Sequence, residues 1–221
     1  HRYLHSFPTR RSSDLGCIVA IIVVKQLFGG IGKNFANPAI TARIIMLISF
    51  TGPMTTWAVP GVDAVTAATP LALMSAGQAP PVLFDLFLGL HLGSIGETSS
   101  AALLLGGVYL LFRKIISWHT PVAFITTVFA LTALFGAQPF QQMFSGGLML
   151  GAIYMATDYS TSPTTSSGKI VFGIGCGIFT ALIRVFGSYP EGVSFAILLM
   201  NIATPHISNL TASKPLGGLK V

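Results

Sequence analysis

From residue 16 onward, apolar stretches alternate with short breaks rich in glycine, proline and polar residues. The apolar stretches are 39–50, 82–96, 101–112, 121–136, 143–157, 170–187 and 192–207, after a shorter one at 16–24. Because a helix needs about 20 apolar residues to cross a bilayer, the pattern predicts about six spanning or near-spanning helices. Small residues within them would let neighbouring helices approach closely. The chain is therefore expected to be all-α, a polytopic integral membrane protein built as a helical bundle with broken helices.

The charge content favours the same class. Of the 221 residues, 52% are hydrophobic and 8% are charged, and the mean hydropathy is +0.75. A soluble domain usually carries about 25% charged residues, so a soluble helical protein with an oversized core is the weaker alternative. The net charge of +6 suits Lys and Arg at the ends of helices that span the lipid bilayer. No nucleic-acid partner is expected, because no basic cluster is interleaved with aromatic residues.

The first fifteen residues, HRYLHSFPTRRSSDL, differ from the rest of the chain because they are polar and rich in Arg and Ser. The segment HSFPTRRSSDL resembles the translation of a sequencing adapter. We therefore expect residues 1–15 to be non-native and residues 16–221 to form the membrane domain of a chain that lacks its true N-terminus. A genuine cytosolic tail is the alternative, whereas a signal peptide is disfavoured because no cleavage site follows the apolar run at 16–24.

An acid and two hydroxyls stand among small and aliphatic residues in the stretch VDAVTAATPLAL, as Asp63, Thr66 and Thr69. Pro70 biases the backbone of Thr69 toward an extended form, and the two preceding alanines leave its hydroxyl open. Such a hydroxyl could accept a bulky covalent group, although a plain hydroxyl is a weak nucleophile and needs an enzyme or a base. The residue types alone favour a loop with an Asp or Thr helix cap.

Two segments echo each other: NFANPAITAR at 34–43 and YSTSPTTSSGK at 159–169. Each places proline directly after Asn or Ser, then hydroxyl residues, and ends on a basic residue. Paired interruptions at matching positions are typical of repeat-built transporters, whose sites form at broken helices. The match is short, so a true repeat and a chance similarity both stay open on this pattern.

The stretch DAVTAAT, residues 63–69, resembles the flavinylation motif D-x-x-[ST]-[GA]-A-T, in which a flavin transferase joins FMN through its phosphate to the last Thr. The blocks KQLFGGIGKNFANPAITAR, GSIGETS, MATDYSTSPTTSSG and YPEGVSFAILLMNIATP resemble, in the same order, the family of the Rnf complex D subunit. That family also contains the B subunit of the sodium-translocating NADH:quinone reductase. The resemblance covers residues 16–207, with Ala67 where many members have Gly and Ser208 where many have an acid.

The resemblance implies that Thr69 carries covalent FMN and that Asp63 and Thr66 belong to the motif read by the flavin transferase. It also implies a second, non-covalent flavin, riboflavin, near the helix breaks, where we name Asn37, Pro38 and Thr41. Members of the family consist of two inverted five-helix repeats, in agreement with the echo. The family also places the flavinylated Thr on the extracytoplasmic side of the plasma (inner) membrane.

Glu97, in SIGETSS, is an acid within an apolar stretch. Such an acid is costly in a membrane and marks a functional site by default, so Glu97 could bind the flavin or line an ion path. The alternative is an acid at the start of the helix ETSSAALLL, near its positive end. Arg43 and Arg184 could pair with acids or with flavin phosphate, although snorkelling is their ordinary explanation.

Cysteine and histidine give no sign of a metal site. Cys17 and Cys176 stand in apolar runs without a CxxC partner, so each is expected to be a small buried hydrophobic residue. His91, His119 and His206 show no metal-ligand spacing.

The function implied by the resemblance is that of a membrane subunit in an ion-translocating ferredoxin:NAD oxidoreductase complex. It would carry electrons through covalent FMN, coupled to Na⁺ or H⁺ movement, together with the other Rnf subunits. No nucleotide-binding fingerprint is present, so this chain alone would hold no complete active site. The alternatives are the B subunit of the quinone reductase, a secondary transporter without a redox role, and a structural subunit in which DAVTAAT is an inert loop.

Overall fold

A computed structural model describes residues 7–30, 32–55, 68–94, 96–187 and 191–212, and all regular structure in these ranges is helical. The elements are α1 (Phe7–Ile18), η1 (Val19–Gln26), α2 (Pro38–Ser49), α3 (Thr51–Thr55), α4 (Pro70–Ser75), α5 (Leu83–Leu88), α6 (Ser100–Phe112), α7 (His119–Leu134), α8 (Pro139–Phe144), α9 (Leu148–Leu150), η2 (Gly151–Met155), α10 (Ser166–Phe186) and α11 (Val193–Thr211). The segments η1 and η2 are π-helical continuations of α1 and α9. The all-α prediction is confirmed.

Two of the described helices, α10 and α11, are long and apolar enough to cross a membrane, while α2, α6 and α7 are shorter apolar helices. Large apolar side chains stand exposed on the outside, such as Leu105 at 74% and Phe112 at 82%. Such a surface suits lipid better than water. The molecule is a helical membrane protein, but the stretch 82–96 forms only the short helix α5, which ends where Gly89 takes a positive φ of 93°.

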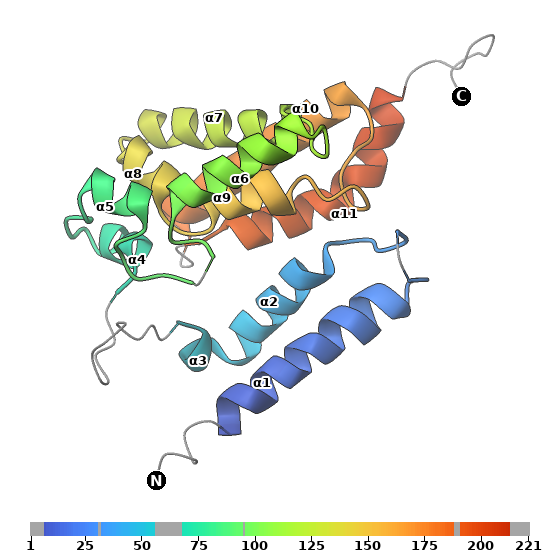
Figure 1. The fold of residues 1–221 in the computed structure, drawn as a ribbon, viewed down its shortest axis with the longest axis horizontal. Helices are drawn as coiled ribbons and strands as arrows, with labels where there is room; N and C mark the ends of the chain where they lie inside the picture. Colours follow the sequence, from blue (N-terminus) through green and yellow to red (C-terminus); the bar gives the residue numbers. More distant parts are fainter. Residues whose placement is uncertain (1–6, 31, 56–67, 95, 188–190, 213–221) are drawn as a thin grey trace.

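Helices α7 and α10 pack against each other along their length, and α11 lies against α10 (Figure 1). Small residues make the first contact possible. A Cβ on Gly173 would lie 2.8 Å from the backbone oxygen of Thr120, and one on Gly177 would lie 2.5 Å from Cβ of Thr127. The expectation that small residues bring the helices together is confirmed here.

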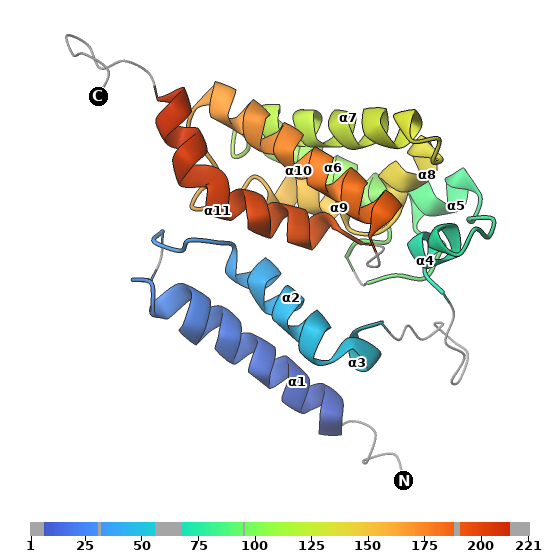
Figure 2. The same ribbon diagram turned by 180° about the vertical axis from the view of Figure 1, so that it is seen from behind.

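Helices α1 and α2 form a separate pair that lies beside the bundle and joins it through contacts between α2 and α11 (Figure 2). The described part of the segment we expect to be non-native continues as one helix from α1 into η1. Its origin stays a prediction. Cys176 is buried in the core, but Cys17 is exposed, so the expectation of burial is wrong for Cys17. The cause is that α1 packs on one side only, where Gly16 faces the side chain of Met46.

Candidate functional site

Thr69 begins helix α4. Its backbone is extended, with φ −68° and ψ 157°, as expected for a residue before proline. Its hydroxyl oxygen accepts a hydrogen bond from the backbone N–H of Ala72 at 3.3 Å, and Pro70 takes the first helical position. The interpretation of Thr69 as a helix cap is thus confirmed, and the same contact fixes the direction of its hydroxyl.

Thr69 lines a cavity of about 320 Å³, which we call the Thr69 cavity. Its wall comes from α2, α3, α4, the start of α11 and the loop at Ser94. Apolar side chains, among them Leu47 and Phe195, form most of the wall, while Arg43 and Glu191 bring opposite charges to it. The cavity therefore combines an apolar interior with a hydroxyl and an ion pair.

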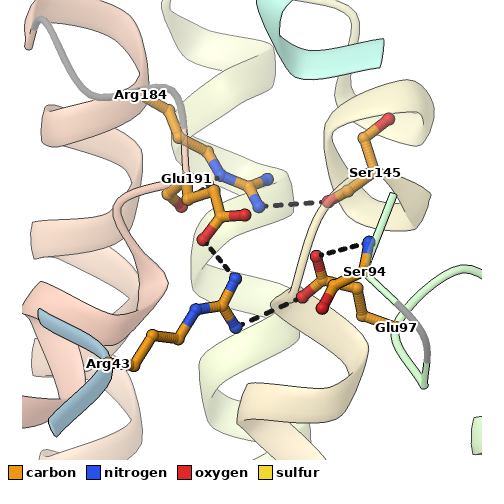
Figure 3. A network of polar contacts seen from close by, with 6 residues as sticks. All are labelled: Arg43, Ser94, Glu97, Ser145, Arg184 and Glu191. Atoms are coloured by element: carbon orange, nitrogen blue, oxygen red, sulfur yellow. Dashed lines mark hydrogen bonds and ion pairs between the residues drawn. The ribbon is translucent and has the colours of Figure 1, made fainter. Parts of the chain in front are cut away.

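Arg43 lies between two acids that come from distant parts of the chain (Figure 3). Its Nη2 donates to Oε2 of Glu191 at 2.7 Å, and its Nη1 donates to Oε2 of Glu97 at 3.4 Å. Glu97 is only 3% exposed and also accepts from the backbone N–H of Ser94 at 3.3 Å. The pairing joins α2 to the loop before α6 and to the loop before α11 in one charge network.

Arg184 supplies the second cation, and it is fully engaged with the backbone. Its Nε donates to the carbonyl oxygen of Glu191 at 3.2 Å, and its Nη2 donates to that of Ser145 at 3.1 Å. Its Nη1 donates to the backbone and side-chain oxygens of Gln142. Arg184 is buried, so snorkelling does not explain it. Gly146, with φ of 63°, leaves the space that Leu71 and the guanidinium fill.

Of the two interpretations of Glu97, the one as a helix N-cap acid is wrong. Ser99 caps α6 instead, because its hydroxyl accepts from the backbone N–H of Ala102 at 3.3 Å. The carboxylate of Glu97 turns inward to Arg43, and a side chain on Gly147 would meet it at 2.9 Å. Glu97 is thus a buried acid within a charge network, whereas Asp63 and Thr66 lie outside the described residues.

Glu191 is a site residue that the sequence did not single out. It stands in the loop between α10 and α11, where Gly192 follows with a positive φ of 62°. Burial raises the pKa of the Glu191 carboxyl above its ordinary value, Arg43 opposes this, and Glu97 adds to it. A signal was present, since an acid in a short loop between two apolar helices is expected to have a charged partner.

This raised pKa predicts a pH dependence. A raised folded-state pKa means that Glu191 contributes stability below its unfolded pKa of about 4.3 and loses it as the pH rises through the folded value. Glu191→Gln cannot ionise, so its unfolding free energy should fall less than that of the wild type as the pH rises above about 4.3. Unfolding in detergent across a pH series measures the difference. Parallel curves for the two proteins would contradict it.

A second cavity, of about 490 Å³, lies at the N-terminal end of α2, and we call it the Asn37 cavity. Asn37 and Pro38 line it, together with residues of η1, η2 and the loop after η2. Asn37 caps α2 by accepting from the backbone N–H groups of Ala39 and Ile40. Thr41 is buried and does not line the cavity, because its hydroxyl donates to the backbone oxygen of Asn37 at 2.9 Å. Of the predicted site residues, Thr69 lines one cavity, Asn37 and Pro38 line the other, and Thr41 and Glu97 line neither.

The two segments of the sequence echo meet beside the Asn37 cavity. Asn201 of α11 is buried and lies between them. In the amide orientation that satisfies both partners, it donates to the backbone oxygen of Thr161 at 3.2 Å and accepts from the backbone N–H of Asn37 at 3.1 Å. Thr204 also donates to Thr161, at 2.9 Å. Both breaks therefore adjoin one face of α11, while a two-fold relation between them stays a prediction.

Comparison with known proteins shows relatives over nearly the whole chain. The model of the NQR2, RnfD, RnfE family matches residues 13–217. The D subunit of the Na(+)-translocating ferredoxin:NAD(+) oxidoreductase complex of Acetobacterium woodii is 50% identical over 212 residues, covering 94% of this chain and 67% of the relative. The proton-translocating counterpart of Clostridium ljungdahlii is 43% identical, covering 89% and 66%. The chain thus spans about two thirds of the length of these relatives, and it belongs to the NQR2, RnfD, RnfE family.

Proposed function

We propose that this chain is the D-type membrane subunit of an ion-translocating ferredoxin:NAD⁺ oxidoreductase complex and carries FMN joined through its phosphate to Thr69. The position of Thr69 carries the proposal, because its hydroxyl stands on a fixed helix start beside a largely apolar cavity with a cation in its wall. The identity to relatives named for such complexes supports the same assignment. The other subunits of the complex would be its partners.

The described residues fit a flavin phosphoester. Thr69 provides the oxygen for the ester, the apolar wall suits the flavin ring, and Arg43 provides positive charge near a phosphate. The volume of about 320 Å³ lies at the lower end of the range for ligand pockets. FMN supplies the electron-transfer chemistry once it is attached, while the chain positions it and limits its contact with water.

The proposal includes coupling to Na⁺ or H⁺ movement, as the names of the relatives state for each of them. It also includes a multi-pass position in the plasma (inner) membrane, with Thr69 on the extracytoplasmic side, where a flavin transferase would act during maturation. The redox role separates this proposal from a permease or a structural subunit.

The mass of the chain tests the redox role. After co-expression with a flavin transferase, the intact chain should gain the mass of FMN less one water, and fragmentation should place it on Thr69. A chain that keeps its unmodified mass under these conditions would refute the flavin assignment and favour a non-redox function.

We propose the Asn37 cavity as the site of a second, non-covalent flavin, riboflavin. Tyr154 and Tyr159 supply aromatic surface there, and the buried Oδ1 of Asn34 has no hydrogen-bond partner among the described residues. Asn34→Ala should lower the flavin released by acid precipitation and leave the covalent flavin unchanged. Equal release from the variant and the wild type would exclude Asn34 from such a site.

A further inference from the structure

We propose that Arg43 binds the phosphoester group on Thr69, and that Glu191 occupies the anion position on Arg43 until the flavin is attached. This inference rests on the proposed attachment of FMN to Thr69. It names Arg43 and Glu191 as residues that position the cofactor. On attachment of the flavin, the phosphate replaces the Glu191 carboxylate on Arg43.

The first argument is the shared cavity. Arg43, Glu191 and Thr69 all line the Thr69 cavity, although they come from α2, the loop before α11 and the start of α4. Among the described residues that line this cavity, Arg43 is the one cation. A phosphate attached to Thr69 therefore enters a cavity whose positive charge is the Arg43 guanidinium.

The second argument is the unused capacity of Arg43. A guanidinium has five N–H donors and binds carboxylate or phosphate best through two parallel hydrogen bonds. Arg43 instead makes one contact to each acid, at 2.7 Å to Glu191 and 3.4 Å to Glu97, and no other hydrogen bond to the described residues. Its side chain is 23% exposed, so part of it faces open space. Arg43 can therefore bind a phosphate through two donors while it keeps its contact with Glu97.

The third argument separates the two arginines. Arg184 donates to backbone oxygens of Gln142, Ser145 and Glu191, and it is buried away from the Thr69 cavity wall. Releasing it would leave those buried oxygens without donors, which is costly. Arg184 thus keeps a structural position, and Arg43 is the arginine available to a ligand.

The fourth argument concerns which acid yields. The two arginines and two glutamates of the network balance in charge, so a phosphodiester adds one negative charge in excess. The Glu97 side chain is 3% exposed, whereas the Glu191 side chain is 27% exposed and can turn toward water. Glu191 is therefore the acid whose ion pair with Arg43 breaks when the phosphate binds. The backbone oxygen of Glu191 still accepts from Arg184, so its loop stays in place.

The experiment compares Arg43→Gln and Glu191→Gln in the flavinylated chain in detergent. Intact mass first verifies that each variant carries FMN. Flavin anisotropy and quenching by acrylamide, which is uncharged, then report how firmly the flavin is held. Arg113→Gln is the matched control, because Arg113 is exposed at the C-terminal end of α6, the end away from Glu97. Arg43→Lys keeps the positive charge and serves if Arg43→Gln does not fold.

The two variants should change the flavin in opposite directions. Arg43→Gln should shift the equilibrium toward the quencher-accessible flavin by about tenfold, the effect of losing one charged hydrogen bond. Arg43→Lys should shift it less in the same direction. Glu191→Gln removes the competing anion, so it should lower both quenching and flavin mobility, while Arg113→Gln should match the wild type.

Two results would overturn the inference. If the network is purely structural, Arg43→Gln and Glu191→Gln should both raise the quenching and the mobility of the flavin. Changes in the same direction in the two variants would therefore contradict the inference. Unchanged quenching in Arg43→Gln and Arg43→Lys would show that the phosphate does not use this arginine. Either result leaves the proposed function intact if the mass still shows FMN on Thr69, whereas absence of FMN from the wild-type chain refutes the proposed function itself.

Discussion

Thr69→Val should abolish the yellow fluorescence of the denatured chain in a gel, because valine has no hydroxyl to form the phosphoester. The variant should also lose the cap of α4, at a cost of about 1 kcal/mol, since the oxygen that accepts from Ala72 is gone. In-gel fluorescence after co-expression with a flavin transferase measures the first effect, and intact mass confirms it.

Two control variants separate the missing hydroxyl from the missing cap. Thr69→Asn keeps a side-chain oxygen that caps a helix as well as Thr does, yet it cannot carry the ester, so it should also lack flavin. Thr126→Val removes an exposed hydroxyl on α7, which donates to Val122 in its own helix, and it should retain full fluorescence. Flavin on the Thr69→Asn chain would show that another residue is the acceptor.

Arg184→Met should destabilise the fold more than any other single change considered for the network. The methionine fills part of the space but leaves the backbone oxygens of Gln142, Ser145 and Glu191 without their donor. Removing one partner from a buried charge network costs about 3–5 kcal/mol. For a chain of this size, such a loss lowers the melting temperature by roughly 10 °C.

Thermal unfolding in detergent, followed by intrinsic fluorescence, measures this effect. Arg113→Met makes the same substitution at an exposed position and should change the unfolding free energy by no more than about 0.5 kcal/mol. Equal melting temperatures for Arg184→Met and the wild type would mean that the bonds made by Arg184 contribute no net stability.

Local features of this molecule could be predicted from neighbouring residues. The extended backbone and capping role of Thr69 follow from Pro70, and the cap of α2 follows from Asn37 before Pro38. The apolar stretches at 170–187 and 192–207 correspond closely to α10 and α11. In each case the information lies within a few residues of the feature.

The features that sequence reasoning missed depend on residues far apart in the chain. Glu191 meets Arg43 across 148 positions, and no local pattern specifies that contact. The sequence around Glu97 is compatible with a helix start, but Ser99 takes the cap in the structure. Helix α5 is short because Gly89 adopts a left-handed conformation and ends it. The length of the apolar stretch 82–96 does not reveal that end.

Helix α2 carries Asn37 at its start and Arg43 less than two turns later, so both cavities adjoin a single stiff rod of twelve residues, about 18 Å in length. It packs against α11 and η1, and Arg43 also ties it to the loops before α6 and α11. A displacement of Arg43 would therefore also move the end of the helix that Asn37 caps. A ligand in one cavity would then change the affinity of the other cavity for its ligand. The factor would be the same whichever ligand binds first.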